Sequence, residues 1–129
     1  MAEKKYSGNL IRGPFTEGEG GSAGTMIQAL RDEYGAGLSL SYRCINSTGF
    51  SRPEPLTHEY HEIIAFIGGN PENIHDFGAE VRICLGEEME EHIITGPTVV
   101  SIPAGMSHCP LTVTKCEKPI VMLEVFMTK

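Results

Sequence analysis

The stretch THEYHEIIAFIGG, residues 57–69, decides how the rest of the sequence is interpreted. Two histidines and two glutamates lie within five positions, and a run of branched and aromatic apolar residues follows, ending in two glycines. A zinc-protease helix requires the order HExxH, whereas the order here is HExHE. β-branched and aromatic side chains favour a strand, and Pro53 and Pro55 disfavour a helix just before it. The stretch therefore predicts a strand with a polar first half.

On a strand, successive side chains point to opposite faces of the sheet. We therefore expect His58, Tyr60 and Glu62 on one face and His61 on the other, unless a β-bulge shifts the register. Taken alone, these residues leave two interpretations open. His58 and Glu62 either bind one ion inside a barrel or form the solvated end of an ordinary strand.

The remainder of the chain predicts a series of short strands, because its 15 glycines and 8 prolines interrupt it at short intervals. Apolar residues alternate with small or polar ones at 37–45, which is typical of a half-buried strand, and again at 79–86. Further strand candidates are 61–67, 87–95, 97–103, 108–114 and 119–128. Residues 26–35 fit either one helix or a strand with a hairpin. Many short strands with at most one helix predict an antiparallel sandwich or small barrel.

Composition limits the classes of function. The 129 residues suffice for one domain, and 17 acidic against 10 basic residues give a formal charge of -7. Because phosphate binding needs clustered Lys and Arg, we expect no nucleic-acid partner. No apolar run approaches the roughly 20 residues of a membrane span, so we expect no membrane partner and a cytoplasmic location. The four cysteines contain no CxxC pair and are expected to be reduced thiols.

A second segment, GPTVVSIPAGMSH at residues 96–108, changes the interpretation of the first. It runs from a turn through a strand into Pro-Ala-Gly and then a histidine. An HxxxE strand followed by a PxGxxH turn resembles the two motifs of the cupin superfamily, G(x)5HxH(x)3-4E(x)6G and G(x)5PxG(x)2H(x)3N. Pro103, Gly105 and His108 match the second motif without adjustment.

In the first motif, His58 takes the place of the second histidine, and Glu62 is followed by six residues and then Gly69. The sequence departs from the motifs in three places: Leu56 replaces the first histidine, Gly96 lies one residue too far from the proline, and Thr112 replaces the final asparagine. The resemblance covers roughly residues 38–126.

The resemblance implies an all-β, single-domain cupin: a double-stranded β-helix, or jelly-roll, barrel with at most one short helix. We expect residues 1–36 to form an N-terminal extension, strand or helix, that supplies dimer contacts, and residues 37–129 to form the barrel. Many cupins pair as dimers, so we also expect a homodimer.

The resemblance further implies a divalent metal ion, such as Fe, Mn, Zn or Ni, held by His58, Glu62 and His108. Because the first motif histidine is missing, the set is one ligand short. His61, if a bulge turns it inward, or Glu80, on the polar face of the strand at 79–86, would complete it.

The expected function is that of a metal-binding cupin acting on a small oxygenated organic molecule, as a dioxygenase, an isomerase or a lyase. Glu62, Glu80 or Tyr60 would move protons in such an enzyme. The alternative is a non-catalytic cupin that binds or senses a small molecule or sugar. Fold alone does not choose between them.

Overall fold

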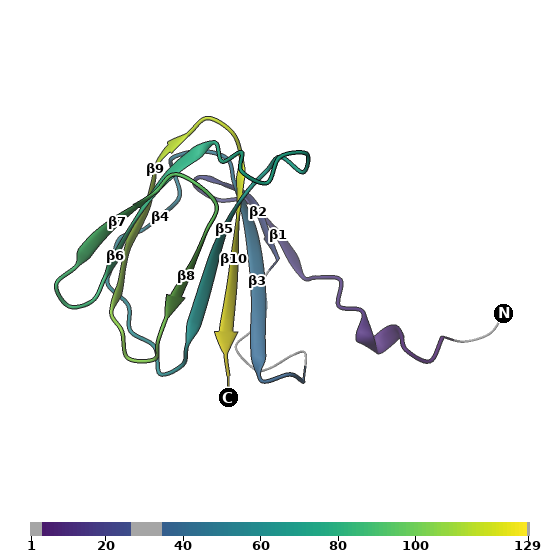
Figure 1. Cartoon of the computed structure of the whole chain (residues 1–129). Helices are drawn as coiled ribbons and strands as arrows, with labels where there is room; N and C mark the ends of the chain where they lie inside the picture. The colour runs from purple at the N-terminus through teal and green to yellow at the C-terminus, as the bar shows by residue number, and fades with distance from the viewer. Residues whose placement is uncertain (1–3, 27–34, 129) are drawn as a thin grey trace.

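The computed structural model describes residues 4–26 and 35–128 (Figure 1). Strands dominate this part of the chain, which confirms the all-β prediction. The elements are η1 Ser7–Asn9, β1 Phe15–Glu17, β2 Ser22–Met26, β3 Leu38–Ile45, β4 Ser51–Arg52, β5 Glu62–Gly68, β6 Ala79–Leu85, β7 Glu90–Ile94, β8 Thr98–Ile102, β9 His108–Cys116 and β10 Ile120–Met127. The helix or hairpin predicted at 26–35 falls largely outside the described residues. No helix in the described ranges has the length and apolarity needed to cross a membrane.

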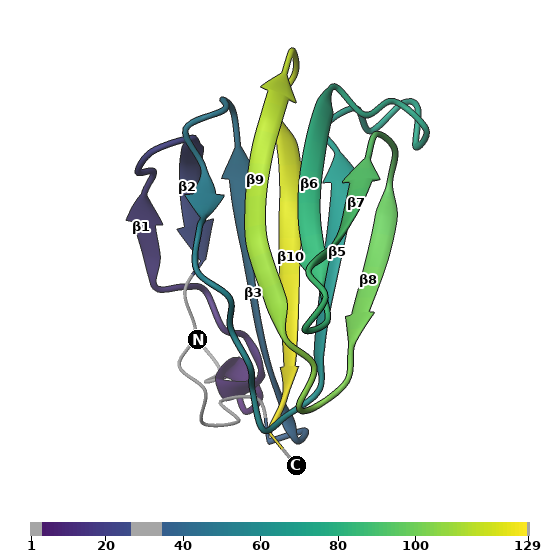
Figure 2. The same cartoon turned by 90° about the vertical axis from the view of Figure 1, so that its left-hand side faces the viewer.

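The strands form two antiparallel sheets that face each other. One has the order β1-β2-β3-β10-β5-β8 and the other the order β4-β9-β6-β7. In Figure 2, β9 and β6 lie in front of β3, β10 and β5. Apolar side chains from both sheets fill the space between them, and the largest buried ones include Phe66, Ile83, Leu111 and Met122. Burying one such side chain stabilises the fold by about 1.5–3 kcal/mol.

Strands β1 and β2 extend the larger sheet beside β3. The division into an extension at 1–36 and a barrel at 37–129 stays a prediction, since these two strands share a sheet with the barrel strands.

Strand β6 has the orientation that its alternation predicts. Ala79, Val81 and Ile83 are buried between the sheets, and Glu80 and Arg82 lie on the outer face. This corrects the expectation that Glu80 points into the barrel. The apolar face of β6 is the inner one because it packs against the core.

Strand β3 has the opposite orientation to the one that its apolar residues suggest. Leu40 and Tyr42 lie on the outer face, whereas Ser39, Ser41 and Arg43 lie on the inner one. The register explains the reversal: Ser41 is opposite Glu124 of β10, and directly opposed residues share a face. This part of the barrel interior is polar, so polar residues of β3 face inward.

Backbone hydrogen bonds bring the two motif segments together at one end of the barrel. The N–H and C=O groups of Leu56 bond those of His108, at 2.7 and 2.9 Å, and the Gly105 N–H donates to the His58 carbonyl at 2.8 Å. Gly105 has a φ of +85°, a conformation that L side chains rarely adopt, so the turn requires glycine. The first motif therefore differs from its prediction: the strand begins only at Glu62, and residues 57–61 form a loop docked on this turn.

Candidate metal centre

Three side chains from distant parts of the sequence converge where the two motif segments meet. His58 lies in the loop before β5, Glu62 is the first residue of β5, and His108 is the first residue of β9. Their ligand atoms all lie within 4.8 Å of one another. Oε1 of Glu62 is 3.4 Å from Nε2 of His58 and 3.3 Å from Nε2 of His108. The three residues form a group that could hold a metal ion.

The Glu62 carboxylate supplies the test of whether a cation fits. Its side chain is only 2% exposed, and neither oxygen accepts a hydrogen bond from any described residue. Leaving a buried polar group unpaired costs about 1–3 kcal/mol, and more for a charge. A divalent ion between the carboxylate and the two imidazole nitrogens would remove that cost. Two nitrogens and one oxygen are ligands that Zn, Fe, Mn and Ni all accept.

The protonation equilibria of the three groups are linked. Burial raises the pKa of the Glu62 carboxyl, His108 partly opposes this, and the neighbouring Glu124 adds to the rise. The Glu62 carboxylate raises the pKa of His108, whereas burial followed by the charge of His108 lowers the pKa of His58. Because a metal binds the ionised carboxylate and neutral imidazoles, metal binding by these three groups would depend on pH.

A second buried carboxylate, Glu124 of β10, lies beside Glu62 and is fully paired. Arg52 of β4 donates from Nη1 and Nη2 to its two oxygens, at 2.8 and 2.6 Å. Burial alone would raise the pKa of Glu124, but these hydrogen bonds and the charge of Arg52 lower it. Glu124 is therefore a fixed anion held by Arg52. The single charged residue in the apolar run PIVMLEVFMT was the sequence signal for this buried group.

A cavity of about 290 Å³ opens next to the cluster. One wall is aromatic: Tyr60 stacks on His58 with ring centroids 4.7 Å apart, and Phe126 meets both rings edge-on. Most of the other lining residues are polar, and they include residues of β3, β4 and β10. The lining residues are Thr25, Ser41, Arg43, Arg52, Leu56, His58, Tyr60, Glu62, Glu124 and Phe126.

The residues considered as a fourth ligand lie elsewhere. Nε2 of His61 is 2.7 Å from the Ser101 hydroxyl in an exposed pair, so no bulge turns this ring inward. Glu80 accepts a hydrogen bond from the Thr114 hydroxyl at 2.6 Å and lies 3.6 Å from Arg82, on the outside of the barrel. Neither residue is placed to complete the cluster. Leu56 lines the cavity at the position of the missing motif histidine.

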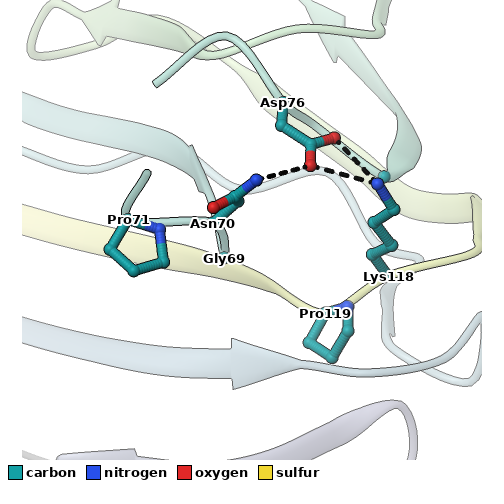
Figure 3. Close-up of a pocket in the computed structure, with 7 residues that line it drawn as sticks. Gly69, Asn70, Pro71, Asp76, Lys118 and Pro119 are labelled. Atoms are coloured by element: carbon teal, nitrogen blue, oxygen red, sulfur yellow. Dashed lines mark hydrogen bonds and ion pairs between the residues drawn. The ribbon is translucent and has the colours of Figure 1, made fainter. Parts of the chain in front are cut away.

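A second hollow, of about 380 Å³, lies at the opposite end of β5 (Figure 3). Asp76 accepts hydrogen bonds there from Lys118, at 3.0 and 3.2 Å, and from Asn70 at 3.1 Å. The charged groups at this end satisfy one another. Within the described residues, the grouping of potential metal ligands lies at the other end.

Two facing antiparallel sheets with a histidine–glutamate cluster at one end of the barrel are the features of a double-stranded β-helix protein with a candidate metal centre. No protein-family model matches the chain, and no curated protein sequence matches it. The fold, in contrast, has clear counterparts among solved structures.

An RmlC-like cupin from Shewanella frigidimarina matches 92% of this chain and 86% of its own, with a TM-score of 0.58 and 10% identity. The polyketide cyclase RemF from Streptomyces resistomycificus matches 100% of this chain and 81% of its own, with a TM-score of 0.54 and 17% identity. Recombinant oxalate oxidase in complex with glycolate matches 98% of this chain, which spans 61% of that protein, with a TM-score of 0.58 and 16% identity. The chain therefore has the fold of the cupin superfamily, as its two motifs predict.

Proposed function

We propose that this chain binds a divalent metal ion through His58, Glu62 and His108 and acts as an enzyme on a small oxygenated organic molecule. The observation that carries the proposal is the buried Glu62 carboxylate, which faces two imidazole nitrogens and accepts no hydrogen bond within the described ranges. Similar structures include a polyketide cyclase and an oxalate oxidase, so enzymes of different kinds use this fold.

The three proposed ligands leave open positions on the ion, and the adjacent cavity gives a ligand access to them. When bound, the ion would supply Lewis-acid chemistry towards an oxygen atom of the ligand. Tyr60 lines the same cavity, and burial raises its pKa, so its hydroxyl stays protonated and can donate a hydrogen bond. Any proton on Glu62 or His108 would be released when the ion binds. A dioxygenase, an isomerase and a lyase all fit this arrangement.

The alternative is a cupin that binds a small molecule without turning it over. Leu56 favours this alternative, because an apolar side chain lines the cavity where the cupin motif has a metal-binding histidine. A site with one ligand fewer holds its ion more weakly.

The metal site is tested by measuring the metal content of protein purified without chelator. We expect about one equivalent in the wild-type protein and almost none after Glu62→Gln or His108→Ala. His92→Ala is the matched control, because His92 is an exposed histidine paired with Glu90. Equal metal content in all four proteins would refute the assignment.

We also propose that two copies associate through the outer face of the larger sheet. This face carries half-buried apolar side chains, such as Tyr42 and Leu123, and the more exposed Ile67 and Val99, at 41% and 65%. Light scattering should give twice the chain mass of 14.1 kDa, and Val99→Lys combined with Ile67→Lys should give the monomer mass. A wild-type mass of one chain would exclude the dimer.

A further inference from the structure

The cavity beside the proposed metal centre contains an arginine that pairs with neither of the cavity's carboxylates. Arg43 of β3 and Arg52 of β4 both line it, together with Glu62 and Glu124. Arg52 is bound through both amino groups to Glu124. Arg43, in contrast, makes no ion pair with any carboxylate among the described residues, although it lies on the inner face of the sheet.

The two guanidinium groups are held close to each other despite their like charges. Both lie over the ring of Phe50, with Arg43 at 4.8 Å and Arg52 at 5.7 Å from its centroid. A guanidinium over an aromatic face gains a cation–π attraction of about 0.5–1 kcal/mol at exposed sites and more when desolvated. Burial lowers the pKa of Arg43, and the neighbouring Arg52 lowers it further. Arg43 still carries its charge at neutral pH.

A divalent ion in the cluster would give the cavity a net positive charge. The charges of the two arginines and the two glutamates cancel, so the charge of the ion would be left without an opposing group in the cavity. Because the site is partly buried, the attraction for an anion is stronger than it would be in water. The missing partner of this cavity is therefore negatively charged.

We propose that the ligand of this cavity is a small carboxylate whose carboxylate group pairs with Arg43 while a second oxygen reaches the proposed ion. The proposal rests on the metal-binding function proposed above. Arginine suits this role because its planar fork matches the two oxygens of a carboxylate. The volume of about 290 Å³ admits only a small molecule, and Tyr60 and Phe126 would cover its non-polar part.

The test uses glycolate, a small 2-hydroxy carboxylate, and glycolamide, a neutral molecule of nearly the same shape. Binding of each to the full-length, zinc-loaded protein is measured by calorimetry. We expect glycolate to bind at least about tenfold more tightly than glycolamide, since a hydrogen-bonded charge pair is worth this much. We expect Arg43→Met to remove that preference while metal content stays unchanged. Arg82→Met, which removes an arginine from the outer face, is the matched control.

Three results of these titrations would overturn the proposal that the cavity binds a small carboxylate. If the wild-type protein does not bind glycolate, or binds glycolamide equally well, the proposal is overturned. It is also overturned if Arg43→Met binds glycolate as tightly as the wild type. Should the wild type hold no metal, the metal function fails, but the same titrations on the metal-free protein still compare Arg43→Met with the wild type. Arg43→Gln, checked for folding by circular dichroism, replaces Arg43→Met if the latter does not fold, and the same losses are expected.

Discussion

The two ends of the barrel each hold a carboxylate beside a hollow, but the two carboxylates are in opposite states. Asp76, near the end of β5, accepts hydrogen bonds from Lys118 and Asn70. Glu62, at the start of β5, is buried and accepts none from the described residues. Buried polar groups in folded proteins are nearly always paired.

A carboxylate with a structural role is hydrogen-bonded to its neighbours, whereas a carboxylate that binds a ligand lacks donors until the ligand is present. The hollow beside Asp76 is the larger one, yet its carboxylate is already paired with Lys118 and Asn70. In this protein, a buried carboxylate without hydrogen-bond donors therefore indicates a binding site better than cavity volume does.

The largest effect is expected from Arg52→Met, which would remove both hydrogen-bond donors that Arg52 supplies to Glu124. Removing one partner of a buried ion pair costs about 3–5 kcal/mol, because the other charge stays buried. We expect a loss of about 3 kcal/mol in the free energy of unfolding, measured with urea, since Arg52 is 27% exposed. The double variant Arg52→Met with Glu124→Met should recover most of the loss. A single variant as stable as the wild type would show that the Arg52–Glu124 pair contributes little.

The next largest effect on stability is expected from removing the metal. A ligand present at 100 times its Kd stabilises the folded state by about 2.7 kcal/mol. We expect chelator to lower the Tm of the wild-type protein by several degrees and to leave that of His108→Ala unchanged. A chelator effect of equal size in both proteins would place the metal elsewhere.

A smaller effect, an increase in the free energy of unfolding, is expected from Glu62→Met in the metal-free protein. The substitution removes a buried carboxylate whose oxygens lack hydrogen-bond donors. We expect the metal-free variant to be more stable than the metal-free wild type by about 1–3 kcal/mol in urea unfolding. The same experiment on the metal-loaded proteins should reverse the order. A metal-free variant less stable than the metal-free wild type would show that the Glu62 carboxylate is stabilised by a partner other than the metal.

The pH dependence of the metal-free protein should follow from Glu62 and His108. Both have raised pKa values in the folded state, from ordinary values of 4.5 and 6.5. Through these two groups the folded state binds more protons than the unfolded state between the unfolded and folded pKa values, so their contribution to stability falls as pH rises through the folded pKa values. The lowered pKa of His58 acts in the opposite direction, because its contribution falls as pH falls. The lowered pKa of Glu124 acts only below pH 4.5, where stability falls as pH falls. Urea unfolding between pH 5 and 8 should show the decline in the wild type and a flatter profile in Glu62→Met.

The smallest effect is expected from Asp76→Asn at the other end of the barrel. Lys118, its ion-pair partner, is 62% exposed, and pairs of this kind contribute little to stability. We expect an almost unchanged urea midpoint at neutral pH and no change in metal content. A large loss of metal would mean that the two ends of the barrel are coupled.

The sequence predicted the parts of the structure that follow apolar alternation and turn chemistry. The strand β6 and the PxGxxH turn before His108 are examples, because regular apolar alternation and a glycine at positive φ leave few alternatives. The polar wall of the cavity was not predicted. Arg43 alternates with Leu40 and Tyr42 as an outer residue would, and its inward position depends on its register with β10.

The expectation that Glu80 lies inside the barrel was wrong for a similar reason. A glutamate on the polar face of a strand was assigned to the interior because the cluster needed a fourth ligand, whereas the apolar residues of β6 set the orientation. Which face of a strand is inner depends on the sheet that it opposes, and a single sequence does not contain that information.

The hydrogen bonds that join Leu56 to His108, and Gly105 to His58, have a consequence for how such sites change during evolution. They run between main-chain atoms and hold the two loops together whatever side chains the loops carry. A substitution at position 56 therefore leaves intact the main-chain bonds that present His58 and His108.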